Sequence, residues 1–108
     1  MISKPRTAHL KAPFLVALLA LTGLIGACES TPPVQEMSDA RQAIAVAKEA
    51  GAEEYAASDL SAAEDLLASA QVKLVERSYN LARRDATQAK KKALAALKTS
   101  EQQNPPPE

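Results

Sequence analysis

The stretch that decides the fold is 58-SDLSAAEDLLASAQVKLV-75. Apolar residues recur in it at spacings of three and four, which places them on one face of an α-helix. These residues are Leu60, Ala63, Leu67, Ala70 and Leu74, widened by Leu66 and Val75. Ser58, followed by Asp59, is expected to be the N-cap of this helix. An amphipathic helix of this kind must cover its apolar face with other helices.

A shorter helical pattern precedes this stretch, over residues 36–50. Its apolar face is made of Met37, Ala40, Ile44 and Ala47. We expect Gly51 to end this helix as a C-cap and residues 52–57, which include Tyr55, to form a connector.

A third helix is predicted from Tyr79 to about Ser100, with Ser78 as its cap. Its apolar face is almost entirely alanine, with two leucines at the far end: Tyr79, Ala82, Ala86, Ala89, Ala93 and Ala96, then Leu94 and Leu97. Residues 76–78 are expected to break the chain between the second and third helices. One continuous helix is the alternative, because no glycine or proline forces a turn there.

The predicted fold class is all-α: a short three-helix antiparallel bundle, or a helical hairpin plus one helix. The core would be thin, since alanine fills most of its positions. A coiled-coil contact between copies is the alternative use of the leucine and alanine stripe, and a homo-oligomer would relieve the thin core.

The charges are divided along the chain. Residues 36–67 hold eight acidic and two basic residues, whereas residues 68–101 hold eight basic and three acidic ones. If the second and third helices fold back on each other, their opposite charges lie side by side. The acidic set is Asp59, Glu64 and Asp65, and the basic set is Lys90, Lys91, Lys92 and Lys98.

The first part of the chain is typical of an export signal. Basic residues precede an apolar run over residues 14–25, and two small residues, Gly26 and Ala27, follow it. This is the order of a secretory signal peptide. A transmembrane helix is the alternative, but a span needs about 20 apolar residues and this run is shorter.

The segment Leu24-Ile25-Gly26-Ala27-Cys28 resembles a lipobox, the cleavage site of bacterial lipoproteins. The resemblance implies cleavage before Cys28 and covalent lipid (diacylglyceryl and a further acyl chain such as palmitate) on Cys28, with no other cofactor. Glu29, which is not Asp, favours the outer membrane, facing the periplasm. We therefore expect a signal peptide (1–27), a flexible tether (28–35), a helical domain (36–101) and a disordered proline-rich tail (102–108).

The segments 50-AGAEEYAASDL-60 and 78-SYNLARRDATQA-89 together resemble domain-of-unknown-function family 4398 of small bacterial lipoproteins. The residues that match the family pattern are Ala50, Gly51, Ala52, Tyr55, Ala56 and Leu60, then Leu67 and Ala70, then Tyr79, Ala82, Arg83, Ala86 and Ala89. The resemblance implies a short alanine-rich helical domain in the envelope, and it supplies no activity. Ala57 stands where the family often has proline.

The sequence argues against an enzyme. Residues 28–108 contain no histidine, and Cys28 would carry lipid, so neither a Ser-His nor a Cys-His pair can form. Carboxylates alone suit neither zinc nor copper, and we expect no metal site. Gly51 is the only glycine in this range, which excludes a phosphate-binding glycine loop. A pair of glycosidase-type carboxylates is the remaining catalytic alternative.

Two non-catalytic functions remain. The first is an adaptor that the lipid anchor holds at the membrane for an envelope protein partner. The second is a polyanion-binding module that recognises anionic lipid or cell-wall polymer through Arg83, Arg84, Lys90, Lys91 and Lys92. These side chains are more simply interpreted as a solvated face paired with the acidic half. Nucleic acid is not expected, since stacking aromatics are lacking. Tyr55 and Tyr79 fit plugs at the helix turns better than interface anchors.

Overall fold

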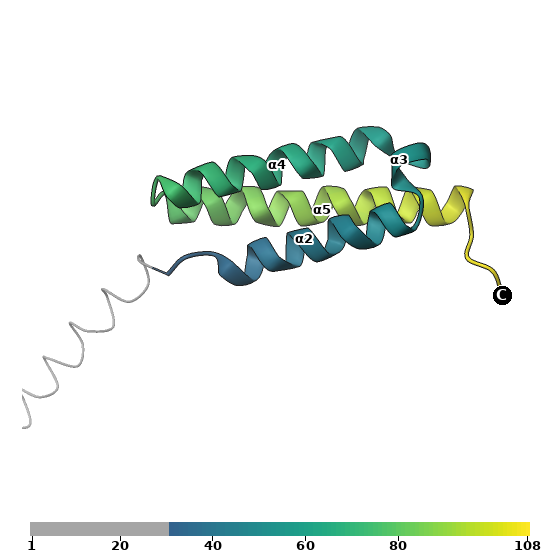
Figure 1. Cartoon of the computed structure of the whole chain (residues 1–108), viewed down its shortest axis with the longest axis horizontal. Helices are drawn as coiled ribbons and strands as arrows, with labels where there is room; N and C mark the ends of the chain where they lie inside the picture. Colours follow the sequence, from purple (N-terminus) through teal and green to yellow (C-terminus); the bar gives the residue numbers. More distant parts are fainter. Residues whose placement is uncertain (1–30) are drawn as a thin grey trace, which may run out of the picture. The chain divides into compact units, whose positions relative to one another are not determined.

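Three long helices and one single-turn helix make up residues 31–108, the part of the chain that the structure, a computed structural model, describes. The helices are α2 (Val34–Glu49), α3 (Ala52–Tyr55), α4 (Ala57–Val75) and α5 (Tyr79–Gln103) (Figure 1). No strand occurs in these residues. The predicted all-α fold class is confirmed.

The three long helices have an up-down-up topology: α2 and α5 run in one direction and α4 runs in the opposite direction (Figure 1). α4 and α5 are antiparallel, since Lys73 pairs with Asp85 at one end and Asp59 pairs with Lys92 toward the other. α2 is parallel to α5: its first turn meets the start of α5 through Glu36, which pairs with Arg83. The first and third long helices therefore begin at the same end of the bundle.

Alanine dominates the core because all three long helices present small side chains to one another. On α5 the fully buried alanines are Ala82, Ala86, Ala89, Ala93 and Ala96. On α2, Met37, Ala40, Ile44 and Ala47 are buried, as the helical spacing predicted. Larger side chains fill the remaining space, with Leu60 buried and Leu67 half-buried on α4. Small side chains let neighbouring helix backbones approach closely. Dispersion contacts between the helices then compensate for the scarcity of large apolar side chains.

The first turn depends on Gly51. This residue has φ +92°, a left-handed conformation that residues with a Cβ rarely adopt. Its N–H donates to the Lys48 carbonyl, and its own carbonyl accepts from the N–H groups of Glu54 and Tyr55. A Cβ at this position would stand 3.2 Å from the Tyr55 ring. The helix ends before Gly51, as predicted, but its C-cap is Ala50 and Gly51 is the N-cap of α3. Tyr55 is half-buried against that turn.

The prediction of a connector over residues 52–57 with Ser58 as N-cap is wrong. The structure forms α3 from Ala52 to Tyr55, and Ala56 is the N-cap of α4. Ala52, Ala56 and Leu60 are all buried. Burying apolar side chains spaced four apart outweighs a serine cap, which contributes about 1 kcal/mol.

The second turn breaks the chain between α4 and α5, as predicted. The Ser78 N–H donates to the Lys73 carbonyl, and the Arg77 N–H donates to the Leu74 carbonyl. This hydrogen-bond pair defines a Schellman motif, in which glycine usually holds the left-handed position. Arg77 holds it instead, with φ +62°. Ser78 occupies the predicted N-cap position of α5 without a side-chain capping bond.

Several helix boundaries and exposures differ from the sequence prediction. α2 begins two residues early, at Val34, with the buried Pro33 as its N-cap. α5 continues to Gln103. Val75 was expected to widen the α4 stripe but is 83% exposed, and Leu94 is 45% exposed, because both point away from the alanine face.

Candidate functional site

A polar cluster is built into the contact between α4 and α5. Asp85 is 5% exposed and lies among the alanines of the α5 core face. Its Oδ2 accepts a hydrogen bond from Ser69 Oγ at 2.7 Å and another from Lys73 Nζ. The Lys73 ammonium, and then the Ser69 hydroxyl, hold the pKa of the Asp85 carboxyl below its usual value of 3.8, against the effect of burial. The ionised carboxylate of Asp85 therefore links α5 to α4 through these two hydrogen bonds.

Sequence reasoning did not identify this cluster. The signal for it was available, since Asp85 falls three residues after Ala82 and four before Ala89, on the predicted apolar face. A carboxylate at such a position requires a partner, because an isolated buried charge is strongly unfavourable. The partners themselves lie on another helix, so spacing alone could not name them.

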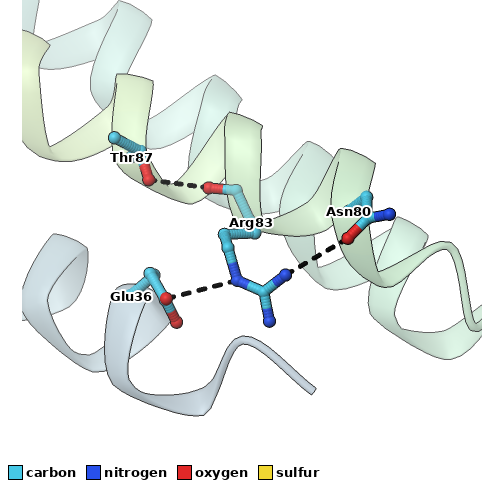
Figure 2. A network of polar contacts seen from close by, with 4 residues as sticks. All are labelled: Glu36, Asn80, Arg83 and Thr87. Atoms are coloured by element: carbon cyan, nitrogen blue, oxygen red, sulfur yellow. Dashed lines mark hydrogen bonds and ion pairs between the residues drawn. The ribbon is translucent and has the colours of Figure 1, made fainter. Parts of the chain in front are cut away.

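A second network joins α2 to α5 near the start of both helices (Figure 2). Arg83 Nε donates to Glu36 Oε1 at 3.2 Å, and Arg83 Nη1 donates to Asn80 Oδ1 at 3.2 Å. Thr87 Oγ1 donates to the Arg83 backbone carbonyl at 2.9 Å. Arg83 and Glu36 are both half-buried, and they fix the α2 entry against α5.

The five basic residues predicted as a polyanion site do not share one face. Consecutive residues on a helix are turned by about 100° from each other. Lys90 accordingly reaches Asp39 on α2 at 3.9 Å, whereas Lys92 reaches Asp59 on α4 at 3.8 Å. Lys91 lies between them and is exposed. Arg83 belongs to the network with Glu36, which leaves Arg84 and Lys91 turned outward.

A narrower basic feature does follow the outer face of α5. Arg84, Lys91 and Lys98 are spaced seven residues apart, so they lie nearly in line on one helix face. All three are exposed, and none of them forms an ion pair within residues 31–108. We call these three residues the outer basic row.

The predicted charge pairing between the second and third helices is confirmed for one pair. Lys92 meets Asp59, as expected. Glu64 instead pairs with Lys48 of α2 at 3.7 Å. Acidic residues of both neighbouring helices therefore pair with α5, since Lys90 also pairs with Asp39 of α2.

A shallow groove runs between α2 and α5. It has a volume of about 230 Å³ and is lined by the apolar Ala43, Val46, Leu94 and Leu97 together with the polar Asp39, Gln42 and Lys90. Val46 is 41% exposed and Leu94 is 45% exposed. We call these four apolar side chains the α2/α5 groove. Because Val46 and Leu94 are partly exposed, the apolar lining of this groove is accessible to another molecule.

The predicted lipobox and lipidation site lie outside the described residues: Leu24, Ile25, Gly26, Ala27 and Cys28. Within residues 31–108, no group of three or more His, Cys, Asp or Glu side chains is placed to hold a metal ion. None of the helices in this part of the chain combines the length and the apolar character needed to cross a membrane.

Comparison with known proteins identifies a family for the helical domain. The family model described as "Domain of unknown function (DUF4398)" matches residues 35–104. The match includes nearly all of α2 and the whole of α3, α4 and α5. No curated protein and no solved structure matches the chain.

Proposed function

The chain belongs to the family of the domain of unknown function DUF4398, and we propose that it is a lipid-anchored, non-catalytic adaptor of the bacterial cell envelope. The observation that carries this proposal is the order of residues 1–28: basic residues, an apolar run, then Leu24-Ile25-Gly26-Ala27-Cys28. A thiol at this place takes lipid, and several acyl chains bind a membrane durably. The helical domain follows after only a few residues, so it works close to the bilayer.

The α2/α5 groove is the surface that best fits a protein partner. Ala43 and Val46 line it from α2, and Leu94 and Leu97 line it from α5, with Val46 and Leu94 partly exposed. Apolar grooves bounded by charges suit the apolar face of an amphipathic helix. An anchor increases the encounter with a membrane partner, because both then share a thin layer of space. Modest affinity in the groove is therefore sufficient.

Mass spectrometry of the protein purified from bacterial membranes tests the anchor. We expect residues 1–27 to be absent and Cys28 to be the first residue, with a diacylglyceryl group on Sγ. The Cys28→Ser variant should lose the lipid and leave the membrane fraction. Recovery of an intact leader, or of an unmodified Cys28 thiol, contradicts the proposal.

Site-specific photo-crosslinking in cells tests the adaptor role. A photoreactive residue at Val46 or Leu94 should capture one defined envelope protein. The same residue at Gln71, which is exposed on α4 away from the groove, is the matched control and should capture none. The crosslink should also disappear in the Cys28→Ser variant. Equal capture from all three positions would contradict a specific adaptor surface.

Polyanion binding is the second candidate function, and the outer basic row favours it. Arg84, Lys91 and Lys98 extend along α5 with no acidic partner among residues 31–108. Binding of the protein to anionic lipid or to wall polymer should then fall steeply between low and high salt. Lys91→Gln with Lys98→Gln should weaken it, whereas Arg41→Gln on α2 should not.

A further inference from the structure

Four of the six exposed large apolar side chains in residues 31–108 lie at one end of the bundle, and the other two, Val46 and Leu94, line the α2/α5 groove. Val34 is the first residue of α2 and is 67% exposed, and Val75 is the last residue of α4 and is 83% exposed. Leu81 lies in the first turn of α5 and is 45% exposed. Val72, one turn before the end of α4, is 58% exposed. We call these four residues the entry-end tip.

The up-down-up topology brings these residues together. α4 ends and α5 begins at the turn over residues 76–78, so Val75 and Leu81 lie at the same end of the bundle. The start of α2 lies at the same end because Glu36 pairs with Arg83 and Met37 packs with Ala70. Figure 1 shows the chain entering α2 at the end where α4 passes into α5.

The two ends of the bundle also differ in charge. At the entry end, Arg77 and Arg84 are exposed beside one exposed glutamate, Glu76, and neither arginine forms an ion pair within residues 31–108. At the opposite end, residues 49–54 and 101–108 contain no lysine or arginine. Those two ranges hold five exposed glutamates: Glu49, Glu53, Glu54, Glu101 and Glu108. The apolar end is thus also the basic end, and the far end is acidic.

The length of chain before the helices restricts what can cover this tip. Val34 follows Cys28 by six residues, which reach about 20 Å when fully extended. If Cys28 carries lipid, as the proposed function states, the entry end can never be far from the bilayer. A surface that is apolar, basic and held beside a membrane fits an anionic bilayer.

We propose that the entry-end tip docks on anionic phospholipid headgroups, so that the bundle stands on the membrane with its acidic end outward. This inference rests on the proposed lipid anchor. Val75 and Leu81 insert at the headgroup boundary, while Arg77 and Arg84 meet lipid phosphates. The anchor supplies a high local concentration, so a small docking surface is sufficient. α5, with 25 residues, then carries the far end about 37 Å from the bilayer surface. The α2/α5 groove stays accessible from the side.

Tryptophan fluorescence tests this orientation, because the chain contains no native tryptophan. The full-length gene is expressed in bacteria, and the membrane-extracted protein is reconstituted into phosphatidylglycerol-containing vesicles with brominated acyl chains. Three exposed positions receive a single tryptophan: Val75→Trp at the tip, Ala95→Trp on the outer face of α5, and Ala57→Trp at the far end. Circular dichroism confirms that each variant keeps its helical content. We expect blue-shifted, strongly quenched emission from V75W only, and loss of that quenching in vesicles of zwitterionic lipid at high salt.

A matched pair of variants then tests the apolar part of the tip. In a Val72→Trp background, Val75→Gln with Leu81→Gln should abolish quenching. Val46→Gln with Leu94→Gln removes the same side-chain types from the α2/α5 groove and should leave quenching unchanged. Equal loss from both pairs would contradict a dedicated docking end.

The remaining outcomes distinguish this inference from the proposed function. Mass spectrometry of the same samples reports the state of Cys28. Acylated Cys28 with unquenched V75W overturns the orientation and leaves the anchor intact. Quenching of both V75W and A95W means that the bundle lies flat on the outer basic row, which also overturns it. An unmodified Cys28 removes the anchor and overturns both ideas.

Discussion

At the scale of single residues, Asp85 determines how α4 meets α5. Its carboxylate is buried, and both of its partners, Lys73 and Ser69, come from the other helix. Buried ion pairs contribute less to net stability than to selecting one arrangement, because desolvation offsets the attraction. A sliding of α4 along α5 by one turn would leave this carboxylate unpaired in an alanine core. The cluster therefore selects the register.

Replacement of Asp85 by asparagine should destabilise the bundle. The neutral amide keeps the shape but loses the charge-assisted hydrogen bonds, which typically contribute about 1–3 kcal/mol. Urea unfolding followed by circular dichroism measures the change in the free energy of unfolding. Asp65→Asn, at an exposed position of α4, is the control and should stay within about 0.5 kcal/mol of the parent. Equal effects of the two variants would show that the Lys73–Asp85 pair does not select the register of α4 against α5.

Acid should weaken the bundle through the same residue. The pKa of Asp85 is lowered in the folded state, so the unfolded chain binds the proton more readily. The stability that Asp85 contributes is complete above the ordinary value of 3.8 and is lost as pH falls through the lowered folded value. Thermal melts from pH 6 to pH 2 should show this loss, and Asp85→Asn should make the curve flatter. A parent curve parallel to that of the variant would contradict the assignment.

At the scale of elements, the two turns both place one residue in the left-handed backbone conformation, but with different amounts of strain. Gly51 adopts positive φ without a Cβ, whereas Arg77 adopts φ +62° with one. A non-glycine residue in the left-handed region carries about 1–2 kcal/mol of strain. The α4–α5 turn is held nonetheless, because the Ser78 and Arg77 N–H groups bond to α4 carbonyls and both helices bury their alanine faces.

Arg77→Gly should therefore stabilise the protein. Removing the Cβ relieves the left-handed strain, and we expect a gain of about 0.5–1 kcal/mol after the greater entropy of glycine in the unfolded chain is subtracted. Arg77→Ala also removes the guanidinium but keeps the Cβ, so it should give no gain. Thermal denaturation of the three proteins compares them directly. A gain from alanine as large as that from glycine would assign the effect to charge.

The alanine face of α5 should tolerate no larger side chain. Ala93 is fully buried, so Ala93→Leu inserts three carbons where helix backbones lie close, at a cost of about 1–3 kcal/mol. Ala95→Leu is the matched control, since Ala95 is exposed two residues further along the same helix. Chemical unfolding should show a marked loss for the first variant and little change for the second. A neutral Ala93→Leu would mean that the core is loosely packed.

At the scale of the whole molecule, ion pairs orient the helices but hold them weakly. Four of the five described pairs join side chains that are roughly a third to a half exposed, and such pairs contribute about 0–1 kcal/mol each. Most of the stability must come from the apolar faces, which bury small side chains over the length of all three long helices. The domain is therefore expected to be only modestly stable.

Salt should accordingly have a small effect on folding. Raising sodium chloride from 0.1 M to 1 M shortens the Debye length from about 10 Å to 3 Å and screens the exposed pairs. We expect the free energy of unfolding to change by less than about 2 kcal/mol, because the buried Lys73–Asp85 pair and the alanine core are screened little. Urea titrations at the two salt concentrations measure this. Unfolding at 1 M salt would show that charge pairing, and not the core, holds the bundle.

The sequence by itself determined the helices, because their signals are local. Spacings of three and four place Met37, Ile44 and Leu60 on core faces, and Gly51 stops a helix wherever the chain goes next. The tertiary structure decided everything that depends on residues far apart in the chain. It set α2 parallel to α5, gave Asp85 its partners, and directed Lys90 to α2 and Lys92 to α4 while Lys91 stayed exposed. Helix periodicity is a property of one segment, whereas pairing and exposure arise only when several segments exclude water together.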